Sequence, residues 1–370
     1  MTSICITKYN AICNLGNDID EIFENAVRYG TEKLEFDNEY IQGIGFYYGK
    51  IKTDLPCIED KNFDIRANRI LKKCLEKIDL QDFFLKYKRD RVAIILATTN
   101  SGIEEFGNTQ NIIHSEIGNP ALFLQKELKT LNYAACISTA CSSGIKVFST
   151  AKRLIENNVC DAVIAGGVDS LAHVTVHGFN SLEVLSKEKS IPFSKNRKGI
   201  NIGEAAALFT IEKSEYGFKI LSIGETSDAY HTSTPEPKGI QASNAIEKAI
   251  KEAGIVPDEI DYINLHGTGT LANDEMEANA VFRVFQDKVY CSSTKPYTGH
   301  CLGAAAALET ALCCHTIKNS LILKHIYDGE YDLNIPHIKL ADDNIEKRVK
   351  IALCNAFGFG GTNSVMLIGE

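Results

Sequence analysis

A cysteine at the junction of a strand and a helix is the first candidate for chemistry in this sequence. Residues 137–144 read ISTACSSG and place Cys141 between an apolar strand pattern and a helical pattern. At a helix N-terminus, free backbone N–H groups and the helix dipole lower the pKa of a thiol, and a sharp turn presents the sulfur to a cleft. The pattern therefore predicts a nucleophilic thiolate. The alternative is a core cysteine among small residues, because cysteine is often buried.

Two histidines lie in glycine-containing loops that follow predicted strands far downstream. His266 belongs to LHGTGT (265–270), and His300 belongs to STKPYTGHCLG (293–303). Both follow the carboxyl end of a strand, where α/β proteins build their sites. One such histidine is more often a structural residue. Two in equivalent positions favour a shared site.

A glycine-rich segment near the C-terminus, NAFGFGGTN (355–363), lies between two strand patterns. Its glycines let the backbone approach a ligand, and a backbone N–H there can stabilise an oxyanion. Any tight hairpin uses similar glycines, so this segment is informative only together with the other three.

The elements that must position these segments alternate between short buried strands and helices. This alternation predicts an α/β protein with largely buried sheets. A charged break at 212–217 divides the chain into two halves, 1–214 and 215–370, which need not fold independently. The predicted strands are 92–97, 133–138, 162–165, 262–265, 289–292 and 351–355, and the clearest predicted helices are 141–156, 243–253, 274–285 and 302–318.

The composition of the 370 residues limits the class of protein. Hydrophobic residues make up 44% and charged residues 24%, which predicts a folded chain rather than a disordered one. Without a long apolar run or a leader-like start, we expect a cytoplasmic protein with no membrane insertion. The net charge of −9, with scattered Lys and Arg, opposes nucleic-acid binding. The 12 cysteines form no CxxC pair, so we expect no structural metal, and Cys313 and Cys314 are expected to be buried.

Taken in order, the segments STACSSG, HGTGT, STKPYTGH and NAFGFGGTN closely resemble the β-ketoacyl-(acyl carrier protein) synthase family, in its elongating form with a Cys-His-His site. The resemblance covers nearly the whole chain. It implies a thiolase fold, in which two pseudo-twofold βαβαβαββ halves form a five-layer α-β-α-β-α sandwich. The implied reaction is a decarboxylative Claisen condensation in fatty-acid, polyene or polyketide synthesis. Its substrates are thioesters on the 4'-phosphopantetheine of acyl carrier protein, with no other cofactor and no metal.

The resemblance also implies roles for individual residues of the site. Cys141 would carry the acyl thioester, while His266 and His300 would stabilise the malonyl thioester as carbon dioxide leaves. Lys295 and Glu309 match an interior ion pair of the family that orients the histidines.

Further matched residues lie around this site. The backbone N–H groups of Cys141 and Phe359 would form an oxyanion hole, and the ring of Phe359 would act as a gate. Thr268 and Thr270 match hydroxyls that bind the pantetheine arm, although simple turn capping is the alternative for both. The other matched residues are Phe357, which belongs with Phe359 to the substrate-binding set, and the supporting carboxylates Asp274 and Glu277.

Related classes differ from this chain at recognisable positions. A thiolase has a second reactive cysteine near the C-terminal glycine loop, and 355–363 contains none. An initiating synthase has asparagine in place of His300, and a silent chain-length partner lacks the nucleophile. The expected partners are acyl carrier protein and a second copy of the chain, with a chain-length-factor-like subunit as the alternative. Glu183 replaces an arginine that meets the acidic carrier in many relatives, so docking should differ in detail.

Overall fold

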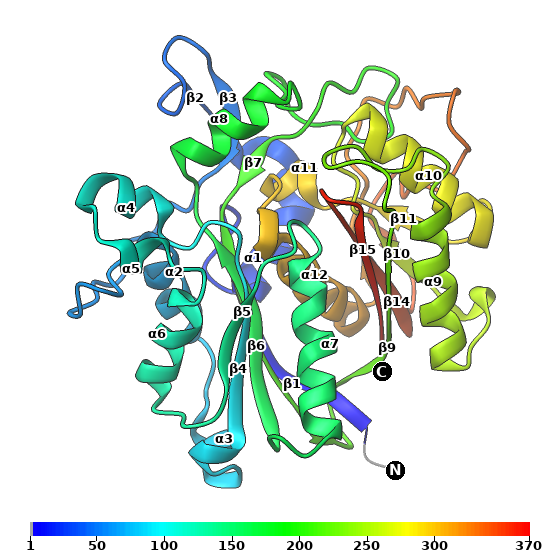
Figure 1. Cartoon of the computed structure of the whole chain (residues 1–370). Coiled ribbons are helices and arrows are strands. Elements are labelled where there is room, and N and C mark those ends of the chain that lie inside the picture. Colours follow the sequence, from blue (N-terminus) through cyan, green and yellow to red (C-terminus); the bar gives the residue numbers. More distant parts are fainter. Residues whose placement is uncertain (1–2) are drawn as a thin grey trace.

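The computed structural model describes residues 3–370, and a ten-stranded mixed sheet runs through it (Figure 1). Five strands come from the N-terminal part of the chain and five from the C-terminal part, and the two sets lie side by side. In spatial order the strands are β11 (Tyr290–Ser292), β10 (Tyr262–Asn264), β14 (Ile351–Gly358), β15 (Thr362–Gly369), β9 (Phe218–Ser227), β1 (Ser3–Ile12), β8 (Ala205–Ser214), β6 (Ala162–Asp169), β4 (Val92–Ala97) and β5 (Ala134–Ile137).

The two sets of strands have the same topology. Along the sheet they run β5-β4-β6-β8-β1 and β11-β10-β14-β15-β9, so each set has its third strand at the outer edge and its first strand in the middle of the sheet. In both sets the first two of these pairings are parallel and the last two are antiparallel. The turn between β8 and β9 coincides with the predicted division between 1–214 and 215–370. That these halves are separate domains stays a prediction.

Two helices pack against each other between the two sets of strands. Helix α7 (Ser143–Glu156) contacts β4 and β6 on one side and β15 on the other, and α12 (Ala305–Asn319) contacts β1, β8 and β14. Every residue of α12 from 305 to 317 is buried, Cys313 and Cys314 among them, as its nearly all-round apolar pattern predicted. The outer layers are α2 (Arg66–Leu75) and α6 (Asn119–Leu128) on the N-terminal strands, and α9 (Ile240–Ala253) with α10 (Leu271–Phe285) on the C-terminal strands.

A glycine lets the two central helices approach closely. A Cβ at Gly144 would lie 2.6 Å from the backbone nitrogen of Ala307, closer than side chains tolerate. Gly144 follows Cys141 by three residues, and α12 begins shortly after His300. This crossing therefore sets the distance between two segments that carry candidate chemistry.

Strand β4 agrees with its prediction, but other elements begin or end elsewhere. Strand β6 extends past its predicted end to Asp169, because it continues through Gly166, where any side chain would clash with the carbonyl oxygen of Ala207 in β8. Strand β14 likewise continues to Gly358. The helix predicted at 141–156 begins only at Ser143, and the one predicted at 302–318 begins at residue 305 after a short 3-10 turn.

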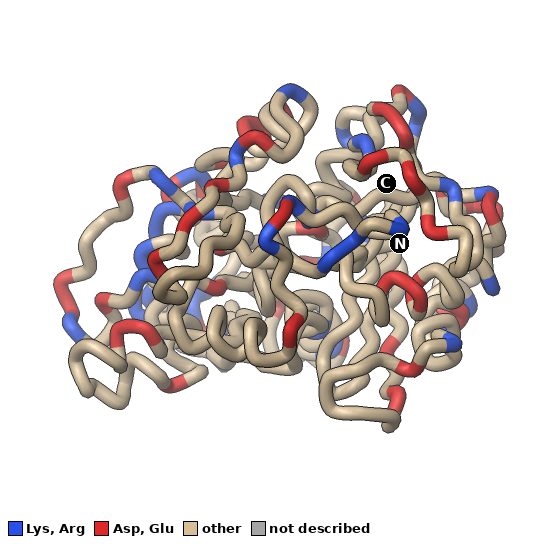
Figure 2. Tube along the Cα trace, turned by 90° about the horizontal axis from the view of Figure 1, so that it is seen from above, with Lys and Arg blue, Asp and Glu red and all other residues tan. Residues whose placement is uncertain are grey.

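Within residues 3–370, no helix has the length and apolar character needed to cross a membrane. Lys and Arg alternate with Asp and Glu along the trace and form no single stripe (Figure 2). The remaining elements surround the core. They are α1 (Ile19–Tyr29), α3 (Gln81–Lys86), α4 (Ile103–Thr109), α5 (Ile112–Ser115), α8 (His173–Ser181), α11 (Lys295–Thr298), β2 (Glu35–Asp37), β3 (Phe46–Gly49), β7 (Ile202–Gly203), β12 (Leu321–Ile322) and β13 (Ile345–Glu346), with 3-10 turns at Gly30–Lys33, Arg89–Arg91, Pro257–Glu259 and Leu302–Ala304.

Candidate active site

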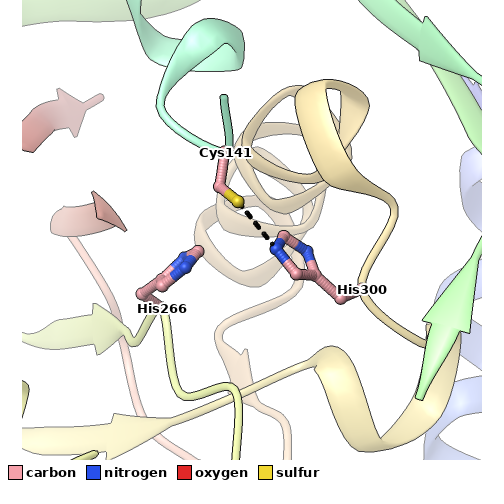
Figure 3. Close-up of side chains that lie close together, drawn as sticks. All are labelled: Cys141, His266 and His300. Atoms are coloured by element: carbon pink, nitrogen blue, oxygen red, sulfur yellow. Dashed lines mark hydrogen bonds between the residues drawn. The ribbon is translucent and has the colours of Figure 1, made fainter. Parts of the chain in front are cut away.

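Cys141 lies in the turn between β5 and α7. The residue before it, Ala140, has φ of 52°, in the left-handed region, so the chain turns sharply as it enters the helix. The sulfur points toward His266 and His300, which come from the loop after β10 and the segment after β11 (Figure 3). The fold thus brings together three of the side chains that the sequence singled out.

The thiol of Cys141 is not a resting thiolate. Burial raises its pKa to about 11, although the Lys295 ammonium and the backbone N–H groups of Phe359 and Cys141 itself act to lower it. The predicted thiolate was therefore wrong. The physical reason is that α7 begins two residues beyond Cys141 and that this residue is only 7% exposed, so loss of hydration exceeds the effect of the helix terminus. The effect of these two N–H groups on the pKa indicates that both lie near the sulfur, and their role as an oxyanion hole stays a prediction.

The two histidines are buried and neutral. His300 Nε2 lies 3.0 Å from Cys141 Sγ, and the two imidazole rings stand nearly perpendicular with centroids 5.4 Å apart. Burial holds the pKa of both histidines well below the usual 6.5, and the positive charge of Lys295 lowers it further. A neutral imidazole beside a protonated thiol can accept its proton.

A buried ion pair fixes the tautomer of His266. Lys295 Nζ lies 2.5 Å from Glu309 Oε1 and 3.3 Å from His266 Nδ1. An ammonium group only donates hydrogen bonds, so Nδ1 accepts and the proton of the neutral ring is on Nε2. The pair thereby makes His266 a hydrogen-bond donor toward the cavity.

Two further carboxylates hold the loop that carries His266. Glu277 accepts hydrogen bonds from the backbone N–H groups of His266 and Gly267, both at 2.7 Å. Burial raises the pKa of Glu277 to about 7, and these bonds oppose that shift. Asp274 accepts from the N–H groups of Phe193 at 2.8 Å and Gly269 at 3.2 Å. Both carboxylates position the loop without reaching the reacting atoms.

Two cavities meet at Cys141. The smaller, about 150 Å³, is lined by both histidines and by the four predicted substrate-binding residues Thr268, Thr270, Phe357 and Phe359. The hydroxyls of Thr268 and Thr270 lie 3.0 Å apart, and Thr270 also caps α10 through the N–H of Asn273. Thr270 therefore both caps the turn and lines the cavity.

The larger cavity, about 600 Å³, shares Cys141 with the smaller one, and the residues of its wall were not predicted from the sequence. Phe359 and Phe179 line both cavities, and their ring centroids are 5.8 Å apart. Phe179 is on α8, a helix missed because its polar and apolar residues show no clear period. The wall away from the two rings includes Thr99, Asn100, Ser138 and Thr175.

The site also has the spacing of a metal site. The ligand atoms of Cys141, His266 and His300 lie within 4.8 Å of one another. Zinc accepts such donors, but it requires a thiolate, whereas this thiol has a raised pKa and a lysine ammonium lies beside one imidazole. The donor set therefore fits a resident metal poorly, and a metal-free site stays a prediction.

Comparison with known proteins places this arrangement in a family. Residues 128–216 match the family model described as beta-ketoacyl synthase, N-terminal domain, and residues 218–327 match the corresponding C-terminal domain. The chain is 34% identical to nodulation protein E of Rhizobium meliloti over 98% of both proteins. It belongs to the β-ketoacyl synthase family.

Other relatives agree with this assignment. The chain is 33% identical to 3-oxoacyl-[acyl-carrier-protein] synthase 2 of Staphylococcus aureus, over 98% of the chain and 97% of that protein. A match to the Coxiella burnetii enzyme of the same name, 34% identical, spans 63% of the chain and 61% of that protein. A solved ketosynthase from Xenorhabdus doucetiae, in complex with its chain length factor, superposes with a TM-score of 0.95 at 33% identity, over 100% of this chain and 98% of that one. The predicted thiolase fold and the predicted class, an acyltransferase that forms carbon–carbon bonds by condensation, are confirmed.

Proposed function

We propose that this β-ketoacyl synthase elongates an acyl chain held on Cys141 with a malonyl unit from acyl carrier protein, using His266 and His300 for decarboxylation. One observation carries the proposal: the Cys141 sulfur lies where two cavities meet, with two neutral histidines beside it. Such a site can hold an acyl chain on one side and an extender on the other.

Acyl transfer comes first. Cys141 Sγ attacks the thioester carbonyl of an acyl carrier protein while its proton passes to His300 Nε2, 3.0 Å away. The backbone N–H groups of Cys141 and Phe359, which lower the pKa of the thiol, stabilise the oxyanion of the tetrahedral intermediate. The carrier thiol leaves with a proton from the imidazolium, so His300 returns to its neutral form.

Decarboxylation and condensation follow in the smaller cavity. The Nε2–H group of His266 donates to the malonyl thioester oxygen, where charge develops as carbon dioxide departs, and His300 adds a second donor once its neutral ring carries the proton on Nε2, the tautomer opposite to the one that accepts the thiol proton. The resulting carbanion attacks the acyl thioester, the new carbon–carbon bond forms, and the sulfur leaves as a thiolate that takes a proton from water. Thr268 and Thr270 hold the pantetheine arm in this cavity. The carriers bring the substrates on phosphopantetheine, and no other cofactor takes part.

The edge of the sheet offers a surface for a partner subunit. Strand β5 ends the sheet, so one of its sides has no strand neighbour within residues 3–370. Two exposed apolar residues, Leu131 and Tyr133, precede it in the sequence. We propose that a second subunit binds here, either another copy or a chain-length-factor-like protein such as the one in the Xenorhabdus complex. Sedimentation of the chain alone and with a candidate partner distinguishes the two.

The carrier would approach beside α8. Leu182 lines both cavities and is exposed, and Glu183, the next residue, is exposed as well. An acidic side chain at this rim repels an acidic carrier, so we expect docking to rely on other contacts. The cytoplasmic location likewise stays a prediction.

The test is intact-protein mass spectrometry after incubation with carrier protein that bears an acyl thioester, followed by peptide mapping. We expect one acyl group on Cys141, and none on a Cys141→Ala variant. A matched Cys301→Ala variant should still be acylated, because Cys301 is fully buried and lines neither cavity. Acylation that persists in Cys141→Ala would refute the proposal.

A further inference from the structure

Asp169, the last residue of β6, carries a fully buried carboxylate outside the Cys-His-His site. Its Oδ1 accepts hydrogen bonds from Thr98 Oγ1 at 2.8 Å and from the backbone N–H groups of Thr99 at 2.8 Å and Asn100 at 2.9 Å. Its Oδ2 accepts from Thr99 Oγ1 at 2.8 Å and from the Gly303 N–H at 2.7 Å. Asp169 forms no salt bridge within residues 3–370; burial raises its pKa, and the hydrogen bonds from Thr98, Thr99 and Asn100 oppose that shift.

One group of these donors belongs to the wall of the larger cavity. Thr99 and Asn100 both line that cavity together with Cys141. Asn100 Oδ1 in turn accepts from Thr175 Oγ1 at 2.8 Å, and Thr175 is a cavity residue on α8. Asp169 therefore fixes one wall directly and reaches the opposing helix through Asn100.

The remaining donor belongs to the segment that carries His300. Gly303 follows His300 by three residues, and between them Leu302 has φ of 52° and lines the larger cavity. A Cβ at Gly303 would lie 2.9 Å from Asp169 Oδ2, so glycine is needed for this approach. The bond to Asp169 holds the strained turn through which the chain passes from His300 into α12.

Asp169 acts by holding two segments in place and not by an electrostatic effect on the pKa of His300. The pKa of His300 responds to burial and to Lys295, and Asp169 is not among its causes. What the carboxylate provides is a rigid link between two segments that are far apart in the sequence.

We propose that Asp169 is a positioning residue that ties the acyl-cavity wall at Thr99 and Asn100 to the segment carrying His300. Through this link it sets which acyl chains reach Cys141 in a productive position. The inference rests on the proposed function, because it takes the larger cavity as the acyl site. A displacement of about 1 Å at a reacting group can cost about 100-fold in rate, so loss of one such link has a large effect.

An Asp169→Asn variant tests the link with almost no change in volume. Both oxygens of Asp169 face donors, so the amide nitrogen of asparagine must face an N–H or O–H group whichever way it lies. We expect the amide nitrogen to face Gly303, because fewer hydrogen bonds are lost on that side. The measurement is the rate at which Cys141 is acylated by octanoyl and acetyl carrier protein, by mass spectrometry, together with carbon dioxide release from malonyl carrier protein.

The expected result is a fall of about tenfold or more in the octanoyl-to-acetyl ratio, with slower carbon dioxide release. The matched control is Glu212→Gln, a buried carboxylate opposite the first residue of β6 and about 23 Å from Asp169 along the strand. It should lower the melting temperature and leave the ratio unchanged. A folded Asp169→Asn with an unchanged ratio, or an equal change in Glu212→Gln, overturns the proposal.

A second variant covers the case in which Asp169→Asn does not fold. Thr98→Val removes one donor to Oδ1, and Thr98 is buried and lines neither cavity. It should shift the ratio in the same direction by a smaller factor, and no shift overturns the proposal. If Cys141 of the unaltered protein takes up no acyl group at all, the proposed function fails instead. The two failures are therefore distinguishable.

Discussion

Replacing each histidine by alanine should separate two chemical steps. His300 Nε2 is 3.0 Å from the Cys141 sulfur, whereas His266 makes no hydrogen bond to it. We therefore expect His266→Ala to slow decarboxylation of malonyl carrier protein while acylation of Cys141 continues. His300→Ala should slow both steps, because it removes the proton acceptor for the thiol as well as an oxyanion donor.

The size of each effect follows from what is removed. One oxyanion donor is worth about 2.7 to 4 kcal/mol, so His266→Ala should lower carbon dioxide release by roughly 100- to 1000-fold. Lys295 keeps its bond to Glu309 at 2.5 Å in this variant, so no buried charge is left unpaired. For His300→Ala, loss of a proton acceptor adds a decrease of roughly 100- to 10,000-fold in acylation, and the acyl-enzyme should still be detectable after long incubation.

Two assays on the same preparations measure these effects. Radiolabelled carbon dioxide from malonyl carrier protein reports decarboxylation, and intact mass reports acylation of Cys141. The control is His315→Ala, which removes a buried histidine that lines neither cavity and should change neither rate beyond its effect on stability. Unaltered carbon dioxide release by His266→Ala would refute the assigned role, and so would equal acylation rates in the two variants.

Three further predictions concern the gate, the thiol and the helix crossing. Phe359→Ala keeps the backbone N–H but opens the boundary between the cavities, so carbon dioxide released per ketoacyl product should rise, and an unchanged ratio in a folded variant would leave the ring as packing only. Because the pKa of Cys141 is about 11, its alkylation by iodoacetamide should rise about tenfold per pH unit from pH 6 to 9, and a plateau beginning below pH 8 would contradict the raised pKa. Gly144→Ala should destabilise the fold by about 1 to 3 kcal/mol through its clash with Ala307, and thermal unfolding identical to the parent protein would exclude that crossing.

The chemistry-bearing segments were predictable because each is local. A turn after a buried strand can be recognised from a few residues, and Cys141 and His266 occupy such turns, whereas His300 lies beyond the short helix α11 that follows β11. The buried strand β4 and the internal helix α12 follow from short-range apolar patterns as well. Strand ends were less predictable. Strand β6 continues through Gly166, and this glycine allows a close approach to β8, some 40 positions away along the chain.

The ionisation of the site was decided only by tertiary structure. The sequence places Cys141 near a helix terminus, which lowers the pKa of a thiol, but burial by distant segments raises it instead. The neutral state of the histidines depends in the same way on burial and on Lys295. Loss of hydration depends on everything that packs around a group, and no local pattern contains that information.

The division into two cavities also arises from packing. Phe179 and Phe359 are separated by 180 positions in the sequence, yet their rings meet at the boundary, and Asp169 joins Asn100 to Gly303 across the core. The sequence determined the family and the fold and predicted the reacting residues, because these rest on local motifs in a fixed order. Their protonation states, the cavity walls and the links between them were decided by the tertiary structure, because solvent exclusion and hydrogen bonding act between residues that only the fold makes neighbours.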